Sequence, residues 1–283
     1  MQDDGRGSAM SQYELTSIFQ VRHIMAPLIP EGTLNVGMPM SQGKEMLKNN
    51  SFEYGVVRDA YRIVGLIARE ELESTEAALP SGPPVRRLEL DYLLPEVTPI
   101  PELIPMLGVF PFHLVVRGKQ VIAVVEVSDL NKHPVYAYLY CELSLLEQYL
   151  ADLIETCFPK VEMWRALLPE NRWRQVEARW TQAKANGREV NPVHYLCFAD
   201  YMRIVAASPQ MLDDLEFGGK AVWQDYVGAM EDLRNDVMHP VRDLVGTHRS
   251  AKKLAQIDER IQSLISRAGK LVPKYFEKWV WQT

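Results

Sequence analysis

The residues of this sequence that are best suited to catalysis lie close together near residue 235. Arg234 and Asn235 are followed by His239 and Pro240. Histidine changes its charge near neutral pH and can act as a general acid or base, and the guanidinium of arginine matches the geometry of a phosphate. Residues five apart point about 140° apart on a regular helix, so Arg234 and His239 would not share a helix face. Because Pro240 disfavours helical backbone at His239, we expect the helix to loosen at 238–239.

A purely structural interpretation of the same residues stays open. A histidine at a helix end can interact with the last carbonyls, and neighbouring arginine and aspartate side chains often form surface ion networks of little energetic consequence. Asp236, Asp232 and Glu231 add negative charge close by. That charge would either raise the pKa of His239 or repel an anionic substrate.

The first half of the chain, about residues 15–139, shows an approximate internal repeat of mixed α and β character. Each copy has the order strand, helix, strand, strand, helix, and its two adjacent strands form a hairpin pattern around a polar turn. The hairpin strands are predicted at 54–58 and 63–68, and at 113–116 and 121–125. Helices are predicted around 44–48 and at 101–107, and further helices are expected to start at 69–72 and 128–130. The linker between the copies is 80–84.

The ends of the two copies resemble the CBS domain, a module that usually works as a tandem pair. A CBS repeat ends with glycine, two apolar residues, Thr or Ser, two variable residues and Asp. The two corresponding segments are Gly65-Leu66-Ile67-Ala68-Arg69-Glu70-Glu71 and Ala123-Val124-Val125-Glu126-Val127-Ser128-Asp129. The first copy departs from the pattern at Ala68 and Glu71. The second keeps Asp129 but departs at the glycine and Thr/Ser positions, which are Ala123 and Glu126. The resemblance implies a tandem pair of about 15–79 and 84–139.

The same resemblance implies a cleft between the copies that binds AMP, ADP, ATP or S-adenosylmethionine as a regulatory ligand. A carboxylate at a helix start can accept hydrogen bonds from both ribose hydroxyls, and a nearby hydroxyl can help to hold phosphate. These roles would fall to Asp129 and Ser128. Apolar strand residues would form the slot for the adenine ring, and the candidates are Tyr54, Val56, Phe112 and Leu114. The alternatives are that Asp129 only stabilises a helix start and that the pair is a dimer interface.

The second half of the chain, about residues 140–283, has the apolar spacing of helices and no convincing strand. Helices are predicted at 141–155, 171–185, 192–206, 220–238 and 249–276. The predicted fold class is therefore α+β, with a mixed N-terminal module and an all-helical C-terminal bundle of normal domain size. The polar residues 1–14 are expected to form a flexible tail.

The helical context makes Arg234, Asn235 and His239 resemble the R-x4–6-H motif of HEPN domains, many of which are metal-independent ribonucleases. The resemblance covers about residues 140–283 and implies a homodimer or a higher even oligomer in which two motifs meet. His239 would activate the 2′-hydroxyl or protonate the leaving 5′-oxygen, and Arg234 would neutralise charge on the phosphorane. Asn235 would orient the imidazole or the phosphate. The substrate would be RNA, such as tRNA or mRNA, and catalysis would need no cofactor.

Composition argues against several other function classes. The net charge is −6 at pH 7, which is not the basic balance of a protein that grips duplex nucleic acid. The three cysteines and the histidines lack ligand-like spacing, so no metal site is expected. No apolar run is long enough to span a bilayer, and the first residues do not resemble a signal peptide. A cytoplasmic protein without a membrane partner is therefore expected.

Together these features predict an adenine-nucleotide-sensing endoribonuclease, in the manner of a toxin or defence effector. Ligand in the CBS-type pair would change the arrangement of the helical dimer. The alternative is a non-catalytic sensor or adaptor, in which the helical domain mediates dimerisation or binds a partner and Arg234 and His239 are structural.

Overall fold

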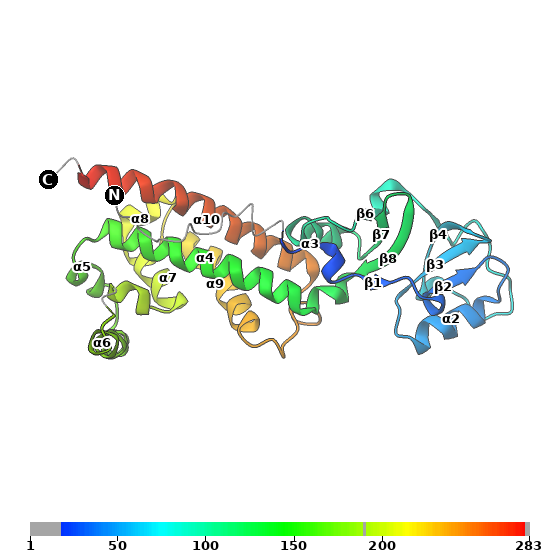
Figure 1. Cartoon of the computed structure of the whole chain (residues 1–283), viewed down its shortest axis with the longest axis horizontal. Coiled ribbons are helices and arrows are strands. Elements are labelled where there is room, and N and C mark those ends of the chain that lie inside the picture. The colour runs from blue at the N-terminus through cyan, green and yellow to red at the C-terminus, as the bar shows by residue number, and fades with distance from the viewer. Residues whose placement is uncertain (1–17, 189–190, 281–283) are drawn as a thin grey trace. The chain divides into compact units, whose positions relative to one another are not determined.

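The chain has a mixed α+β fold that divides into two compact units. The computed structural model describes the backbone of residues 18–188 and 191–280, and the side chains of these residues up to Val272. The first unit, here called the α/β unit, ends at Pro134, and the second, the helical unit, begins at Val135. Figure 1 shows that all of the labelled strands belong to the α/β unit. Residues 1–14, which were predicted to form a tail, lie outside the described residues.

The α/β unit is built from two copies of one arrangement. The first copy contains β2 (Thr33–Asn35), α2 (Met40–Asn49), β3 (Tyr54–Asp59), β4 (Arg62–Ala68) and the one-turn 3-10 helix η3 (Arg69–Glu71). The second contains β6 (Leu93–Pro95), α3 (Ile100–Val109), β7 (Phe112–Arg117), β8 (Gln120–Glu126) and the 3-10 helix η5 (Val127–Asn131). Strand pairing repeats as well, since β2 is parallel to β3 and β6 is parallel to β7. The predicted hairpins are confirmed, and both carry a register shift at the same place, after Val57 and after Val115.

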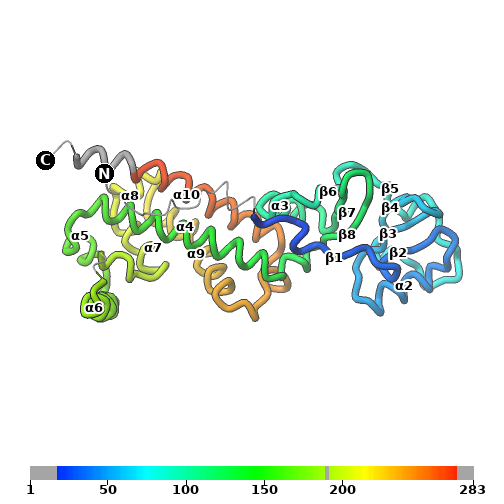
Figure 2. The backbone as a smooth tube through the Cα atoms, in the orientation of Figure 1, coloured from blue at the N-terminus to red at the C-terminus, as the bar shows by residue number. Residues whose placement is uncertain are grey.

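Each sheet is completed by a short strand that precedes the other copy. β1 (Ala26–Pro27) comes before the first copy but pairs with β8, which gives the sheet order β1-β8-β7-β6. β5 (Arg86–Arg87) comes before the second copy but pairs with β4, which gives the order β2-β3-β4-β5. Figure 2 traces the chain through this exchange. A Cβ on Gly65 would lie 2.1 Å from the carbonyl oxygen of Arg86, so the close approach of β5 requires glycine there.

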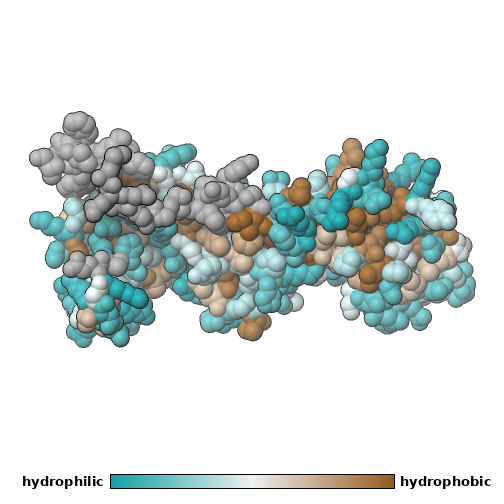
Figure 3. Space-filling view, in the orientation of Figure 1, coloured by the Kyte–Doolittle hydropathy of each residue, from teal (hydrophilic) through white to brown (hydrophobic). Residues whose placement is uncertain are grey.

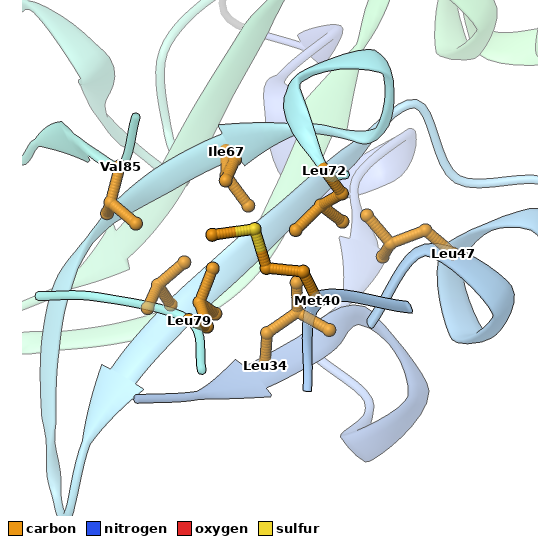
Figure 4. Close-up of a cluster of buried hydrophobic side chains, with 8 residues drawn as sticks. Leu34, Met40, Leu47, Ile67, Leu72, Leu79 and Val85 are labelled. Atoms are coloured by element: carbon orange, nitrogen blue, oxygen red, sulfur yellow. The ribbon is translucent and has the colours of Figure 1, made fainter. Parts of the chain in front are cut away.

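The two faces of the first sheet pack into different cores, because successive strand residues point to opposite faces. Val57 and Ile67 pack with residues of α2 and the segment after η3 in the core of the first copy. Figure 4 shows Ile67 in this core. Val56 and Leu66 pack instead with Phe112 and Leu114 of the second copy. This second cluster, here called the inter-repeat core, joins the copies into one body. On the face shown in Figure 3, apolar side chains gather over the α/β unit.

The prediction of a helix at 69–72 is wrong, because η3 is a single turn. The backbone is already extended at Leu72. The chain then returns along α2, where the carbonyls of Ala77 and Thr75 accept the N–H groups of Met40 and Ser41 at 2.9 Å each. The first N–H groups of a helix have no partner within it. The segment after η3 supplies those partners and forms no helix of its own.

The helix predicted to begin at 128–130 begins instead at His133. η5 is again a short 3-10 helix, and the backbone is extended at Lys132. Pro134 then lies in the first turn of α4 (His133–Cys157), where a missing N–H costs no hydrogen bond. Both copies therefore end in a short turn, and the long helix that follows the second copy is a new element.

The helical unit contains α4 and the helices that follow it. They are α5 (Val161–Arg165), α6 (Glu170–Ala185), the 3-10 helix η6 (Pro192–Tyr195), α7 (Phe198–Ala207), α8 (Pro209–Asp214), α9 (Lys220–Val237) and α10 (Ala251–Val280). The single helix predicted at 192–206 is wrong, because the carboxylate of Asp200 accepts the N–H of Cys197 at 3.2 Å and starts a separate helix there. The short helices α5 and α8 were not predicted. None of the described helices is long and apolar enough to cross a membrane.

Two carboxyl groups are buried between α4 and α10. The hydroxyl of Tyr138 donates to Asp258 at 3.0 Å, and the amide of Gln262 donates to the same carboxylate at 3.1 Å. Glu142 is 0% exposed, and neither of its carboxylate oxygens has a hydrogen-bond partner among the described residues. Burial raises the pKa of Glu142 to about 7, and burial also raises that of Asp258 to about 7.

We expect Glu142→Gln to stabilise the helical unit at pH 8. A carboxyl whose pKa is raised on folding holds its proton better in the folded state, so stability falls as pH rises from about 4.5 to about 7 and stays low above that. Removing the buried charge should raise the free energy of unfolding at pH 8 by about 1–3 kcal/mol and leave little gain at pH 4.5. All six tryptophans lie at or beyond Trp164, so urea denaturation followed by tryptophan fluorescence reports this unit. A variant no more stable than the parent at pH 8 would contradict this description of Glu142.

Candidate functional site

A small cavity of about 40 Å³ lies between the two copies in the α/β unit. We call it the slot. One side comes from β1 and the turn after it, a second from the chain entering β3, and a third from β7, β8 and η5. Its lining residues are Ala26, Pro27, Leu28, Ile29, Gly32, Phe52, Tyr54, Val56, Phe112, Val124, Glu126 and Asp129. The strand exchange therefore shapes the slot, because β1 belongs to the sheet of the second copy.

The apolar wall of the slot contains three of the four residues predicted for it. Val56 and Phe112 are buried in the inter-repeat core, and Tyr54 packs against that core. The rings of Tyr54 and Phe112 are tilted, with their centroids 5.2 Å apart. Leu114 is fully buried in the same core and is not among the residues that line the slot. A flat apolar group in the slot would thus contact Tyr54, Val56 and Phe112.

Asp129 lies at the polar end of the slot and is 5% exposed. One carboxylate oxygen accepts the N–H of Glu126 at 2.8 Å, and the other lies 2.6 Å from the ammonium of Lys132. That ammonium also donates to the carbonyl of Ile24 at 2.5 Å. Burial raises the pKa of Asp129, and the hydrogen bond and charge of Lys132 oppose the rise. Each carboxylate oxygen has two acceptor directions, so Asp129 can still accept a further hydrogen bond from a ligand.

Glu126 also lines the slot and was not predicted as a site residue. The hydroxyl of Ser128 donates to its carboxylate at 2.6 Å, so the predicted phosphate neighbour is engaged inside the chain. Burial raises the pKa of Glu126, and the nearby charges of Asp129 and Glu53 add to the rise. The polar end of the slot is therefore acidic. The signal for Glu126 was present in the sequence, because it occupies the Thr/Ser position of the CBS-like pattern.

The pseudo-equivalent position in the other copy is occupied by larger side chains. Arg86 is the counterpart of Ala26. Arg86 on β5 pairs with Leu66 on β4, and Ala26 on β1 pairs with the equivalent residue of β8, Val124. Glu71 is the counterpart of Asp129, since its carboxylate accepts the N–H of Ala68 at 2.9 Å. The guanidinium of Arg86 lies 2.8 Å from Glu71. An ion pair thus stands where the slot has the methyl group of an alanine.

A second size difference separates the two positions. Tyr92 ends η4 (Leu90–Tyr92), and its ring lies against Phe110 with the centroids 4.4 Å apart. The counterpart of Tyr92 is Gly32, which ends η2 (Pro30–Gly32) beside Phe52. With Ala26 and Gly32 small, the slot stays open. With Arg86 and Tyr92 large, the pseudo-equivalent position is filled.

A second cavity, of about 270 Å³, shares Tyr54 with the slot. We call it the basic recess, because three of its lining residues are cations. These are Lys44 and Lys48 on α2 and Arg69 at the start of η3, and the other lining residues are Glu53, Ala68 and Glu70. The guanidinium of Arg69 donates to the carbonyl of Phe52 at 3.2 Å.

The residues predicted for catalysis have contrasting surroundings in the helical unit. α9 ends at Val237, with Met238 as its last cap, which confirms the predicted loosening at 238–239. Arg234 is half-buried, and its Nε lies 3.7 Å from a carboxylate oxygen of Glu147 on α4. Asn235 and His239 are exposed. The structure thus turns Arg234 toward α4 and leaves His239 in solvent beyond the helix end.

The acidic neighbour of the motif belongs to an ion network. Asp236 lies 2.7 Å from the buried guanidinium of Arg249, 3.5 Å from Arg242 and 3.7 Å from the imidazole of His248. The N–H of His239 donates to the carbonyl of Asp236 at 3.0 Å. Asp236 therefore holds the segment after α9 in place. Among the described residues no group of three His, Cys, Asp or Glu side chains has the arrangement of a metal site.

Comparisons with known proteins give low similarity. No family model matches the chain, and no curated protein matches it. One similar solved structure is the CBS domain of a bacterial CNNM/CorC-family Mg²⁺ transporter in complex with ATP, with 17% identity and a TM-score of 0.37 over 44% of this chain and 91% of that one. Another is a protein from Methanocaldococcus jannaschii, with 14% identity and a TM-score of 0.35 over 88% of this chain and 98% of that one. At this level of similarity neither structure defines a family for the chain.

Proposed function

We propose that the α/β unit is a tandem CBS-type pair whose slot binds one adenine nucleotide, and that the chain is a nucleotide sensor. The observation that supports this is a slot with aromatic walls at Tyr54 and Phe112 and carboxylates at Asp129 and Glu126. A planar base fits the apolar wall, and a ribose with two hydroxyls fits acceptors at the polar end. Adenosine carries both groups in one molecule.

Asp129 keeps its predicted role in this function, whereas Ser128 takes a different one. Asp129 would accept the ribose hydroxyls with its free acceptor directions while Lys132 compensates its charge. Glu126 would accept a second hydrogen bond from the ligand. Ser128 would act indirectly, because its hydroxyl orients the carboxylate of Glu126.

We expect Ala26→Arg to close the slot. The substitution copies the residue found at the pseudo-equivalent position, and its guanidinium can pair with Asp129 as Arg86 pairs with Glu71. Nucleotide affinity should fall at least about tenfold, which corresponds to about 1.4 kcal/mol of lost binding free energy. Isothermal titration with AMP, ADP, ATP and S-adenosylmethionine measures this for whichever compounds bind the parent chain.

The matched control for that variant is Arg86→Ala, which makes the reciprocal change at the filled position. Its ion pair with Glu71 is exposed and contributes little stability, so the parent affinity for the slot should be kept. If none of the four compounds binds the parent chain, or if Ala26→Arg binds as tightly as the parent, the nucleotide-sensor proposal is wrong.

The helical unit would carry the response to the nucleotide. A ligand shifts an equilibrium between two arrangements only by binding one of them more tightly than the other. We propose that this unit mediates homodimerisation or binds a partner, and that nucleotide in the α/β unit changes that association. A chain acting in this way needs no catalytic residue in the helical unit.

A metal-independent endoribonuclease is the second candidate function. The observation that favours it is the exposure of Asn235 and His239 at the end of α9. To contact an RNA phosphate, Arg234 would have to leave Glu147. Burial raises the pKa of Glu147, and the charge of Arg234 opposes that rise. Catalysis would also require a second copy of the chain to complete the site.

The ribonuclease candidate predicts cleavage of labelled tRNA in the presence of EDTA. His239→Ala should lower the rate at least about 100-fold, as expected for loss of a general acid or base, and Arg234→Ala should do the same without changing the oligomeric state. Glu147→Gln should raise the rate, because it frees Arg234. Intact RNA in all of these reactions, with and without ATP, leaves the sensor as the function.

A further inference from the structure

We propose that the basic recess holds the terminal phosphates of the nucleotide whose base and ribose occupy the slot. This rests on the proposed function, and it goes further by naming the ligand class: a nucleoside di- or triphosphate and not AMP or adenosine. The slot and the recess share Tyr54. A ligand seated on the aromatic wall would have to pass Tyr54 to reach the recess.

The charge of the slot itself argues that a phosphate chain must leave it. Glu126 and Asp129 both line its polar end, and a polyphosphate beside two carboxylates would be repelled. The cation closest to them, Lys132, is already in contact with Asp129 and with the carbonyl of Ile24. Phosphates would find their counter-charge only outside the slot.

The recess supplies that counter-charge from three side chains. Lys44 and Lys48 are one helical turn apart on α2, so they lie on the same face, where like charges cost a few tenths of a kcal/mol. No ion pair to Lys44, Lys48 or Arg69 occurs among the described residues, although Glu53 and Glu70 line the same cavity. Among the described residues, three cations without ion pairs thus line one cavity, although the net charge of the chain is −6. Such an arrangement favours an anionic ligand.

The test compares ligands that differ only in their phosphates. Isothermal titration of the full chain at constant ionic strength, without divalent metal, should show ATP binding at least about tenfold more tightly than adenosine. In the double variant Lys44→Gln/Lys48→Gln, ATP affinity should fall to near that of adenosine while adenosine affinity is unchanged. The matched control is Lys252→Gln/Lys253→Gln on α10, which removes the same charge from two exposed lysines and should leave ATP affinity as in the parent.

Several outcomes would overturn the proposal. Equal affinity for ATP and adenosine, or an unchanged ATP affinity in the Lys44/Lys48 variant, would remove the recess from nucleotide binding. S-adenosylmethionine binding more tightly than ATP, with no dependence on the two lysines, would do the same. If adenosine, AMP, ADP, ATP and S-adenosylmethionine all fail to bind, the proposed function fails. Titration with inorganic triphosphate then tests the recess separately. Triphosphate binding that is lost in the double variant keeps the recess as an anion site, and no triphosphate binding removes that proposal too.

Discussion

The exchange of the two-residue strands β1 and β5 is the constraint on which the α/β unit depends. Each strand precedes one copy and completes the sheet of the other, so neither copy forms its four-stranded sheet alone. Without the exchange each copy would have a three-stranded sheet, and one apolar face of that sheet would be uncovered. The inter-repeat core of Val56, Leu66, Phe112 and Leu114 covers that face, and the slot is the space that the exchange leaves beside this core.

The two copies share their backbone but differ in the side chains that decide whether a cavity remains. At equivalent positions Ala26 is matched by Arg86, and Gly32 is matched by Tyr92. The two equivalent carboxylates also differ in exposure. Asp129 is buried beside Lys132, whereas Glu71 pairs with Arg86 at a more exposed position. Duplication thus provides two equivalent positions, and the side chains of Arg86 and Tyr92 fill one of them.

Much of this fold could be predicted from local patterns, and the parts that could not depend on long-range contacts. Alternating apolar runs indicated both hairpins, and helical spacing indicated α4, α6, α9 and α10. The strands β1 and β5 are too short to show any alternation. In the site, the apolar candidates Tyr54, Val56 and Phe112 came from the resemblance to the CBS domain, which places an apolar slot at the hairpin strands. The pairing of Arg234 with Glu147 joins two helices distant in sequence, and no local pattern indicates it.

We propose that one nucleotide position in the α/β unit is open and that its pseudo-equivalent is filled. A crystal structure of the chain grown with a saturating concentration of ATP tests it most directly. We expect one nucleotide in each chain, with its base against Tyr54 and Phe112, its ribose at Asp129, and an undisturbed ion pair between Arg86 and Glu71. A nucleotide bound between Arg86 and Glu71, or two nucleotides in each chain, would contradict the account.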